Sequence, residues 1–195
     1  MTYTTLGRDT ACSRWRIAHT ASLALAVAMT YTNPLQAQLR ATVILPGFRS
    51  PVNMDTLGRA TPVAAPAGAV FAALVRAFDR LRLEPDVRDS ASLAVGRLKL
   101  QALHSFMGAP LSRSVDCGTG TGLRGSRADF DRVHLAILAT VRAVSDGASE
   151  LKLAVGAGSQ ALGGTLNDQI SCVSTGRIEE RLQKLVDDDL ARRRP

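Results

Sequence analysis

The chain has 195 residues, of which 46% are hydrophobic, 21% charged and 4% aromatic, which suits one globular domain with an aliphatic core and argues against two. Its formal net charge of +7 favours contact with anions, but part of that charge is confined to residues 8–16 and 192–194. The other basic residues are interleaved with acidic ones and no aromatic platform accompanies them, so nucleic-acid binding is not expected.

The N-terminal segment has the order of a cleavable signal peptide. Arg14 and Arg16 precede an uncharged apolar run, Ile17–Met29, and a polar, turn-prone stretch then leads to Ala37. A basic end that stays in the cytoplasm, a short apolar helix and a small residue before the cut are the parts of such a signal. We therefore predict a bacterial-type exported precursor that is cleaved between Ala37 and Gln38.

An uncleaved membrane anchor is the alternative to this signal peptide. The apolar run is about 13 residues long, whereas about 20 are needed to span a bilayer. Residues 30–32 would have to lengthen it. Contact with a membrane is expected only through this segment, and only if it is not removed.

Residues 38–61 contain Pro and Gly with little periodicity, and they predict a flexible tether with one short strand at 41–45. Pro66 suits the first turn of a helix. Apolar residues then recur at helical spacing from Val70 to Leu81, and Pro85 ends the pattern.

Strand patterns follow the first helix. Apolar and polar residues alternate over 98–102, and residues 113–117 predict a second, short strand. Residues 132–144 fit a strand or a helix. Their Val, Ile and Thr content, an Asp-Gly turn at 146–147 and the alternation over 151–157 favour a β-hairpin.

The last third of the chain ends in a helix. A Gly-rich loop is expected at 156–167 and a brief strand at 170–173. Ser174 or Thr175 can cap a helix whose apolar stripe runs from Ile178 to Val186. The arginines that follow complement the dipole of this helix, whereas the aspartates at 187–189 oppose it.

These elements predict an α+β domain over residues 62–195, preceded by the signal at 1–37 and the tether at 38–61. An antiparallel sheet of about four to five strands would be covered on its apolar face by an N-terminal and a C-terminal helix. This is a helix-grip-like, two-layer architecture, and such folds host many unrelated activities.

The cysteines agree with export. Cleavage would remove Cys12 and leave Cys117 and Cys172. An even number of cysteines in an oxidising compartment favours a disulfide, so we predict the bond Cys117–Cys172. Two buried free thiols are the alternative, and they would accompany a protein that is not exported.

No motif predicts catalysis or a cofactor. Residues 120–125 satisfy G-x-G-x-x-G, but no βαβ unit surrounds them, so a flexible loop is expected rather than a dinucleotide site. His104 and His134 are isolated, and neither a nucleophile elbow nor the paired Cys and His spacing of a zinc site occurs.

The sequence thus favours an exported protein, periplasmic or extracellular, that works as a non-enzymatic binding or assembly domain of the envelope. One alternative is a carrier that holds a small apolar ligand between the sheet and the C-terminal helix, where Ala154, Gly156 and Gly158 would leave room. The other is a hydrolase built on His104 or His134. An envelope protein or a small apolar molecule is the expected partner, and no cofactor or metal is expected.

Overall fold

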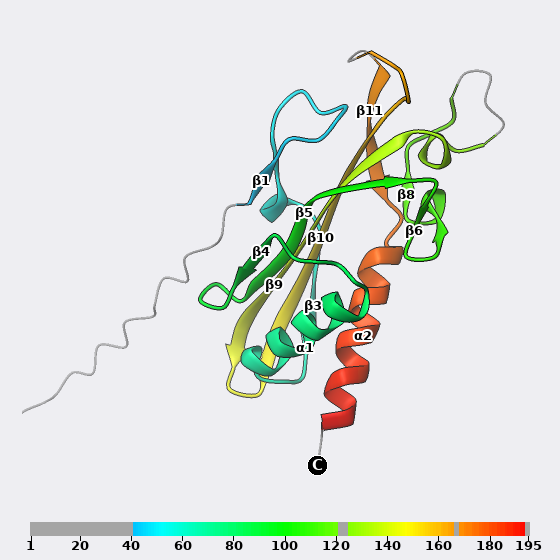
Figure 1. Cartoon of the computed structure of the whole chain (residues 1–195). Helices are drawn as coiled ribbons and strands as arrows, with labels where there is room; N and C mark the ends of the chain where they lie inside the picture. Colours follow the sequence, from blue (N-terminus) through cyan, green and yellow to red (C-terminus); the bar gives the residue numbers. More distant parts are fainter. Residues whose placement is uncertain (1–40, 121–124, 166–167, 194–195) are drawn as a thin grey trace, which may run out of the picture. The chain divides into compact units, whose positions relative to one another are not determined.

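The computed structural model describes residues 41–120, 125–165 and 168–193. The predicted signal peptide, residues 1–37, and its cleavage site between Ala37 and Gln38 lie outside this range. The described residues belong to one compact unit, residues 36–195. It has a mixed α/β fold with a large antiparallel sheet and two helices, as the sequence pattern predicts (Figure 1).

The sheet is organised around one long hairpin, in which β9 and β10 pair along nearly their whole length and turn at 146–147. On its side away from β10, β9 pairs with β5. On its side away from β9, β10 pairs with β3 along its first half and with β11 along its second half. In spatial order the strands are β4 (Val87–Asp89), β5 (Ala94–Leu103), β9 (Arg132–Ser145), β10 (Ala148–Gln160), β11 (Gln169–Ser174) and β8 (Val115–Asp116), with β3 (Arg59–Val63) also beside β10.

Both helices lie on one face of this sheet, α1 (Ala67–Arg80) beside α2 (Arg177–Arg193) (Figure 1). Alternate residues of β9, from Val133 to Val141, point to that face and form one core with the helices. The apolar stripe of each helix is buried there, and each fully buried Leu or Phe contributes about 1.5–3 kcal/mol. The deepest helix residues are Val70, Leu74, Phe78, Ile178, Leu182 and Val186.

The opposite face of the sheet is covered by residues 41–57, which we call the cover segment. It consists of β1 (Thr42–Val43), β2 (Val52–Asn53) and a 3₁₀ helix, Met54–Thr56. Its buried apolar side chains pack on Ala136, Leu138 and Ala154. The short strand expected at 41–45 is present as β1, but the rest of residues 41–61 is not the expected flexible tether, because it forms β2, a 3₁₀ helix and part of β3.

Small residues on β10 make room for the cover segment. A Cβ added at Gly158 would lie 2.1 Å from the carbonyl oxygen of Pro46, and one added at Gly156 would lie 2.9 Å from Leu45 Cδ1. Gly156 and Gly158 were expected to leave room for a ligand, but they admit the chain itself instead. They also do not end the strand, so the loop expected from residue 156 begins only after Gln160.

Other details of the predicted architecture also change. The main sheet has seven strands in the described residues rather than four to five, because the short edge strands β3 and β4 have weak patterns and were not expected, whereas the short strand expected at 113–117 is present as β8. The cover segment adds a third layer to the expected two. The strand at 132–144 and the Asp-Gly turn are confirmed. A separate small hairpin is formed by β6 (Ser105–Phe106) and β7 (Ala109–Pro110).

Gly158→Ala is expected to lower the free energy of unfolding by about 1–3 kcal/mol, because the added methyl group collides with the backbone of the cover segment. Urea unfolding of the oxidised protein measures this loss. Gly68→Ala in α1 is the matched control, since a Cβ there meets nothing within 4 Å. It should leave stability unchanged or raise it by up to about 1 kcal/mol. Equal effects of the two variants would contradict this packing role.

Candidate functional site

The predicted disulfide Cys117–Cys172 is present. Its two Cα atoms lie 4.3 Å apart and its cysteines are 55 positions apart in the sequence. Both are buried, Cys172 within β11 and Cys117 directly after β8. Because β8 and β11 pair over only two residues each, the covalent bond secures this edge of the sheet.

The two histidines of the described residues make different contacts. The Nδ1 atom of His104 lies 2.8 Å from the backbone oxygen of Asp129 on an exposed loop. His134 lies on the same face of β9 as Ala136, and its Nε2 atom is buried without a hydrogen bond in the described residues. Burial, aided by the charge of Arg132, lowers the pKa of His134. In the described part of the chain, neither ring is hydrogen-bonded to a side-chain hydroxyl or carboxylate.

A buried polar network that sequence reasoning missed joins the ends of β9 and β10. The Ser159 hydroxyl donates to Asp131 Oδ2 over 3.0 Å, and Arg127 Nε donates to the same oxygen over 2.9 Å. Arg127 also donates to the backbone oxygen of Asp168. No histidine stands between the serine and the carboxylate, and Ser159 is fully buried. This network therefore serves to attach the loop around residue 127 to the sheet.

The Gly-rich motif at 120–125 lies partly outside the description, which omits 121–124. After Gly125 the chain enters a 3₁₀ helix, Arg127–Asp129, and then β9. A dinucleotide motif would open an α-helix at this point. Within the described ranges, no group of His, Cys, Asp and Glu side chains suits a metal ion, and no helix is long and apolar enough to cross a membrane.

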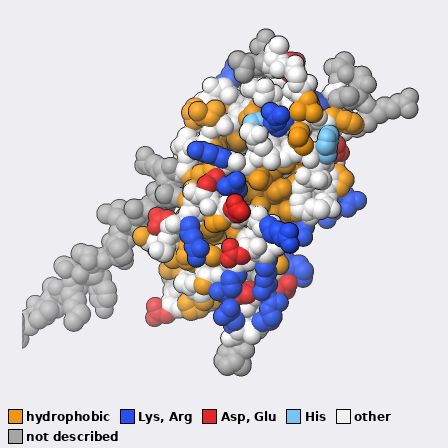
Figure 2. Space-filling model, in the orientation of Figure 1, with side chains coloured by type: hydrophobic (Ala, Val, Ile, Leu, Met, Phe, Trp, Pro, Cys, Tyr) orange, Lys and Arg blue, Asp and Glu red, His pale blue; other side chains and the backbone are white. Residues whose placement is uncertain are grey.

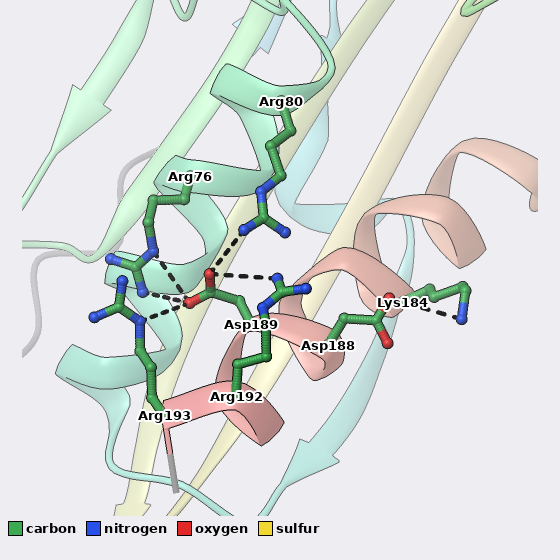
Figure 3. A network of polar contacts seen from close by, with 7 residues as sticks. All are labelled: Arg76, Arg80, Lys184, Asp188, Asp189, Arg192 and Arg193. Carbon is green, nitrogen blue, oxygen red and sulfur yellow. Dashed lines mark hydrogen bonds and ion pairs between the residues drawn. The ribbon is translucent and has the colours of Figure 1, made fainter.

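Basic side chains gather where α1 and α2 lie side by side (Figure 2). At their centre is Asp189, whose side chain is only 5% exposed. Arg76 donates to Asp189 Oδ2 through Nη2 at 2.6 Å and Nε at 3.1 Å, and Arg193 Nε donates to the same oxygen at 3.1 Å. Arg80 Nη2 donates to Oδ1 at 3.3 Å, and Arg192 Nη2 lies 3.8 Å from it (Figure 3). We call these four arginines the arginine cluster.

Helical spacing assembles the arginine cluster. Arg76 and Arg80 are four residues apart on α1, and Asp189 precedes Arg192 and Arg193 by three and four residues on α2. The hydrogen bond from Arg76 is the largest cause that lowers the pKa of Asp189 to about 2, and Arg193 adds to it against an opposing effect of burial. One carboxylate thus holds four guanidinium groups in place, but its single negative charge compensates only one of their four positive charges.

A groove adjoins the arginine cluster. It has a volume of about 430 Å³ and lies between the start of α1, the hairpin turn at Gly147 and the end of α2. Its lining is mostly alanine, with Pro66 and Leu190, and it includes Arg76 and Arg193. We call it the alanine groove. It offers an apolar floor directly beside guanidinium groups.

A second hollow, of about 290 Å³, lies between the β6–β7 hairpin and the start of α2. We call it the hairpin pocket. Phe106, Met107, Ala109 and Ile178 supply its apolar lining. Its charged lining consists of four basic residues, Arg113, Arg177, Arg181 and Lys184, and one acidic residue, Glu180.

The two hollows are joined by basic side chains. Arg177, Arg181 and Lys184 are spaced by four and three residues, which places them on one side of α2. Arg181 donates to the backbone oxygen of Met107, and Lys184 lies 3.7 Å from Asp188. The side chains of Arg113 and Arg177 have no ion-pair partner in the described residues. We call these four residues, with the arginine cluster, the basic face.

No protein-family model, curated protein or solved structure matches the chain.

Reduction of Cys117–Cys172 is expected to lower the free energy of unfolding by about 4 kcal/mol, because the unfolded chain regains the freedom of a loop closed over 55 positions. Urea unfolding with and without a reductant measures this difference. The double variant Cys117→Ser/Cys172→Ser should show the same loss and no response to the reductant. A reductant effect that persists in the double variant would show that the loss comes from elsewhere.

Asp189→Asn is expected to lower the free energy of unfolding by on the order of 2 kcal/mol at neutral pH, because a charged acceptor of several guanidinium hydrogen bonds is lost. The folded-state pKa of about 2 lies below the ordinary 3.8, so the charged form is stabilised by folding. This contribution is complete above about pH 4 and disappears as the pH falls through about 2.

Urea unfolding of the wild type and Asp189→Asn at a series of pH values tests both statements. The difference between the two proteins should be constant near neutrality and shrink below about pH 4. Asp188→Asn is the matched control, since Asp188 is more exposed and its ion-pair partner in the described residues is Lys184 alone. It should change stability by less than about 1 kcal/mol. A difference that grows in acid would contradict the assignment to Asp189.

Proposed function

We propose that this protein is an exported, non-enzymatic binding or assembly domain of the bacterial cell envelope. The observation that carries the proposal is the basic face, where eight cationic side chains outnumber the carboxylates found among them in the described residues, those of Glu180, Asp188 and Asp189, beside two apolar hollows. Such excess charge destabilises a compact domain through self-repulsion. A partner of opposite charge would relieve this repulsion, which gives the basic face a role in binding.

Export is supported by two independent features. The order of residues 14–37 suits a signal peptide. The bond Cys117–Cys172 suits an oxidising compartment, where disulfides form and persist. The proposed location is therefore the periplasm or the outside of the cell.

The hydrolase alternative has no assembled site among the residues that the structure describes. A nucleophile needs a base within hydrogen-bond reach and a third group that orients the base. His104 bonds a backbone oxygen, His134 faces the cover-segment side, and Ser159 donates directly to Asp131. These groups serve the fold rather than a reaction.

The carrier alternative depends on the helix-grip-like arrangement, with free space between the sheet and α2. That space is filled, because Ile178, Leu182 and Val186 are at most 1% exposed and share one core with Leu151 and Val155 of β10. The glycines that would have left room lie against the cover segment. The described residues thus favour a surface for a partner over an internal ligand site.

Expression of the full chain in a bacterial host, followed by mass spectrometry of the periplasmic fraction, tests the proposal. The expected mature mass begins at Gln38 and is two hydrogens lower than that of the reduced chain, because one disulfide forms. In native spectra the protein should retain an envelope protein in a defined ratio. A mass that begins at Met1 with free thiols at Cys117 and Cys172 would contradict export, and a retained small apolar molecule would favour the carrier.

A further inference from the structure

From the shape and charge of the basic face, we infer that it binds an acidic protein segment that carries apolar side chains about 18 Å apart. This inference rests on the proposed function, since it names the class of partner for that binding domain. The two hollows would receive the apolar side chains, and the cations between them would pair with the carboxylates.

The charge of the basic face determines the sign of the partner. The four guanidiniums of the arginine cluster share one carboxylate, so most of their charge is left uncompensated. Arg113 and Arg177 add two more cations without ion-pair partners in the described residues. A second copy of this chain is disfavoured as the partner, because each copy carries a formal net charge of +7 as the full chain and of +5 without residues 1–37.

The apolar parts of the basic face are concave, which distinguishes a protein segment from a membrane. A protein that binds a bilayer surface inserts protruding apolar side chains into it. The large hydrophobic side chains that protrude in the described residues line neither hollow and belong to neither helix. They are Ile44, Phe48, Leu103, Phe130, Val144, Leu162 and Val173. The hairpin pocket and the alanine groove can instead receive apolar groups from a partner.

The distance between the hollows limits the length of the segment. Ile178 lines the hairpin pocket and Leu190 lines the alanine groove. Twelve residues of helix separate them, a rise of about 18 Å along the helix axis at 1.5 Å per residue, which is the least distance between the hollows. An extended segment of about six residues covers this distance at roughly 3.3 Å per residue. A single small anion would reach only one of the two ends.

The test uses fluorescence anisotropy with a labelled peptide that has one leucine at each end of a five-glutamate run, and the oxidised full-length protein. The wild type should bind this probe with a dissociation constant below about 1 mM at physiological salt, weakening as salt rises. Arg113→Glu/Arg177→Glu should weaken binding about tenfold or more, because two attractions become repulsions. These two side chains have no ion-pair partner in the described residues, so the fold should be retained.

Arg132→Glu is the matched control, because Arg132 is an exposed residue of β9 on the same side of the strand as His134, Ala136 and Leu138, the side opposite the helices. It should leave the affinity within about twofold. A probe with serine in place of both leucines should bind the wild type about tenfold more weakly, because the hollows then stay empty. This peptide comparison needs no variant, so the inference remains testable if a charge-reversed protein does not fold.

Four results would overturn the inference. They are the absence of binding up to about 1 mM, equal losses with Arg132→Glu and with Arg113→Glu/Arg177→Glu, equal affinity of the leucine and serine probes, and binding to phosphatidylglycerol vesicles with no binding of the peptide. Failure of the proposed function can be distinguished from failure of this inference, because it appears in the mature mass and in the native mass spectrum rather than in the binding assay. An envelope partner that is retained by Arg113→Glu/Arg177→Glu would leave the proposed function intact and overturn only this inference.

Discussion

The hairpin of β9 and β10 is the constraint on which the rest of the fold depends, because it is covered on both faces. In β9 the five consecutive residues from Leu135 to Ala139 are all buried. Alternate side chains point to opposite sides, so the helices pack on one set, mostly Val, Leu and Ile, and the cover segment packs on the other, which apart from Leu138 is made of small residues such as Ala136 and Ala154. A shift of the hairpin register by one residue would exchange the two sets and bring Leu153 against the cover segment in place of Ala154.

This two-sided burial also explains what could be read from the sequence. A strand buried on both faces has no clean alternation of apolar and polar residues, so the spacing over 132–144 fits a helix as well as a strand. The Val and Ile content and the Asp-Gly turn that follows are what favour the strand. The helices α1 and α2 were readable because each buries only one side. Of the cover segment only the short strand at 41–45 was readable, because Leu45 and Met54 pack against residues such as Ala136 and Ala154 about a hundred positions later in the chain.

The disulfide and the arginine cluster also differ in whether the sequence predicts them. The disulfide followed from counting cysteines and needed no knowledge of the fold. The arginine cluster did not, since Arg76 and Asp189 are 113 positions apart and each alone is an ordinary charge on a helix. In the sequence Asp189 opposes the dipole of its own helix. Arg192 and Arg193 of the same helix offset this in part, and the packing of α1 beside α2 supplies the other two guanidiniums, those of Arg76 and Arg80. The basic face is therefore a product of tertiary structure.

The arrangement around Asp189 connects stability with the proposed binding. A lone arginine at a surface loses much side-chain freedom when it contacts a partner, and that loss opposes association. The hydrogen bonds to Asp189 already hold Arg76, Arg80 and Arg193 in the unbound protein. A guanidinium has five N–H donors. Arg76 uses two of them to bind Asp189, and Arg80 and Arg193 use one each, so donors remain for a second anion. The Asp189 carboxylate thus holds the arginines in place while most of their charge stays uncompensated. An acidic partner then binds with a smaller loss of side-chain entropy and still gains the attraction of the cations.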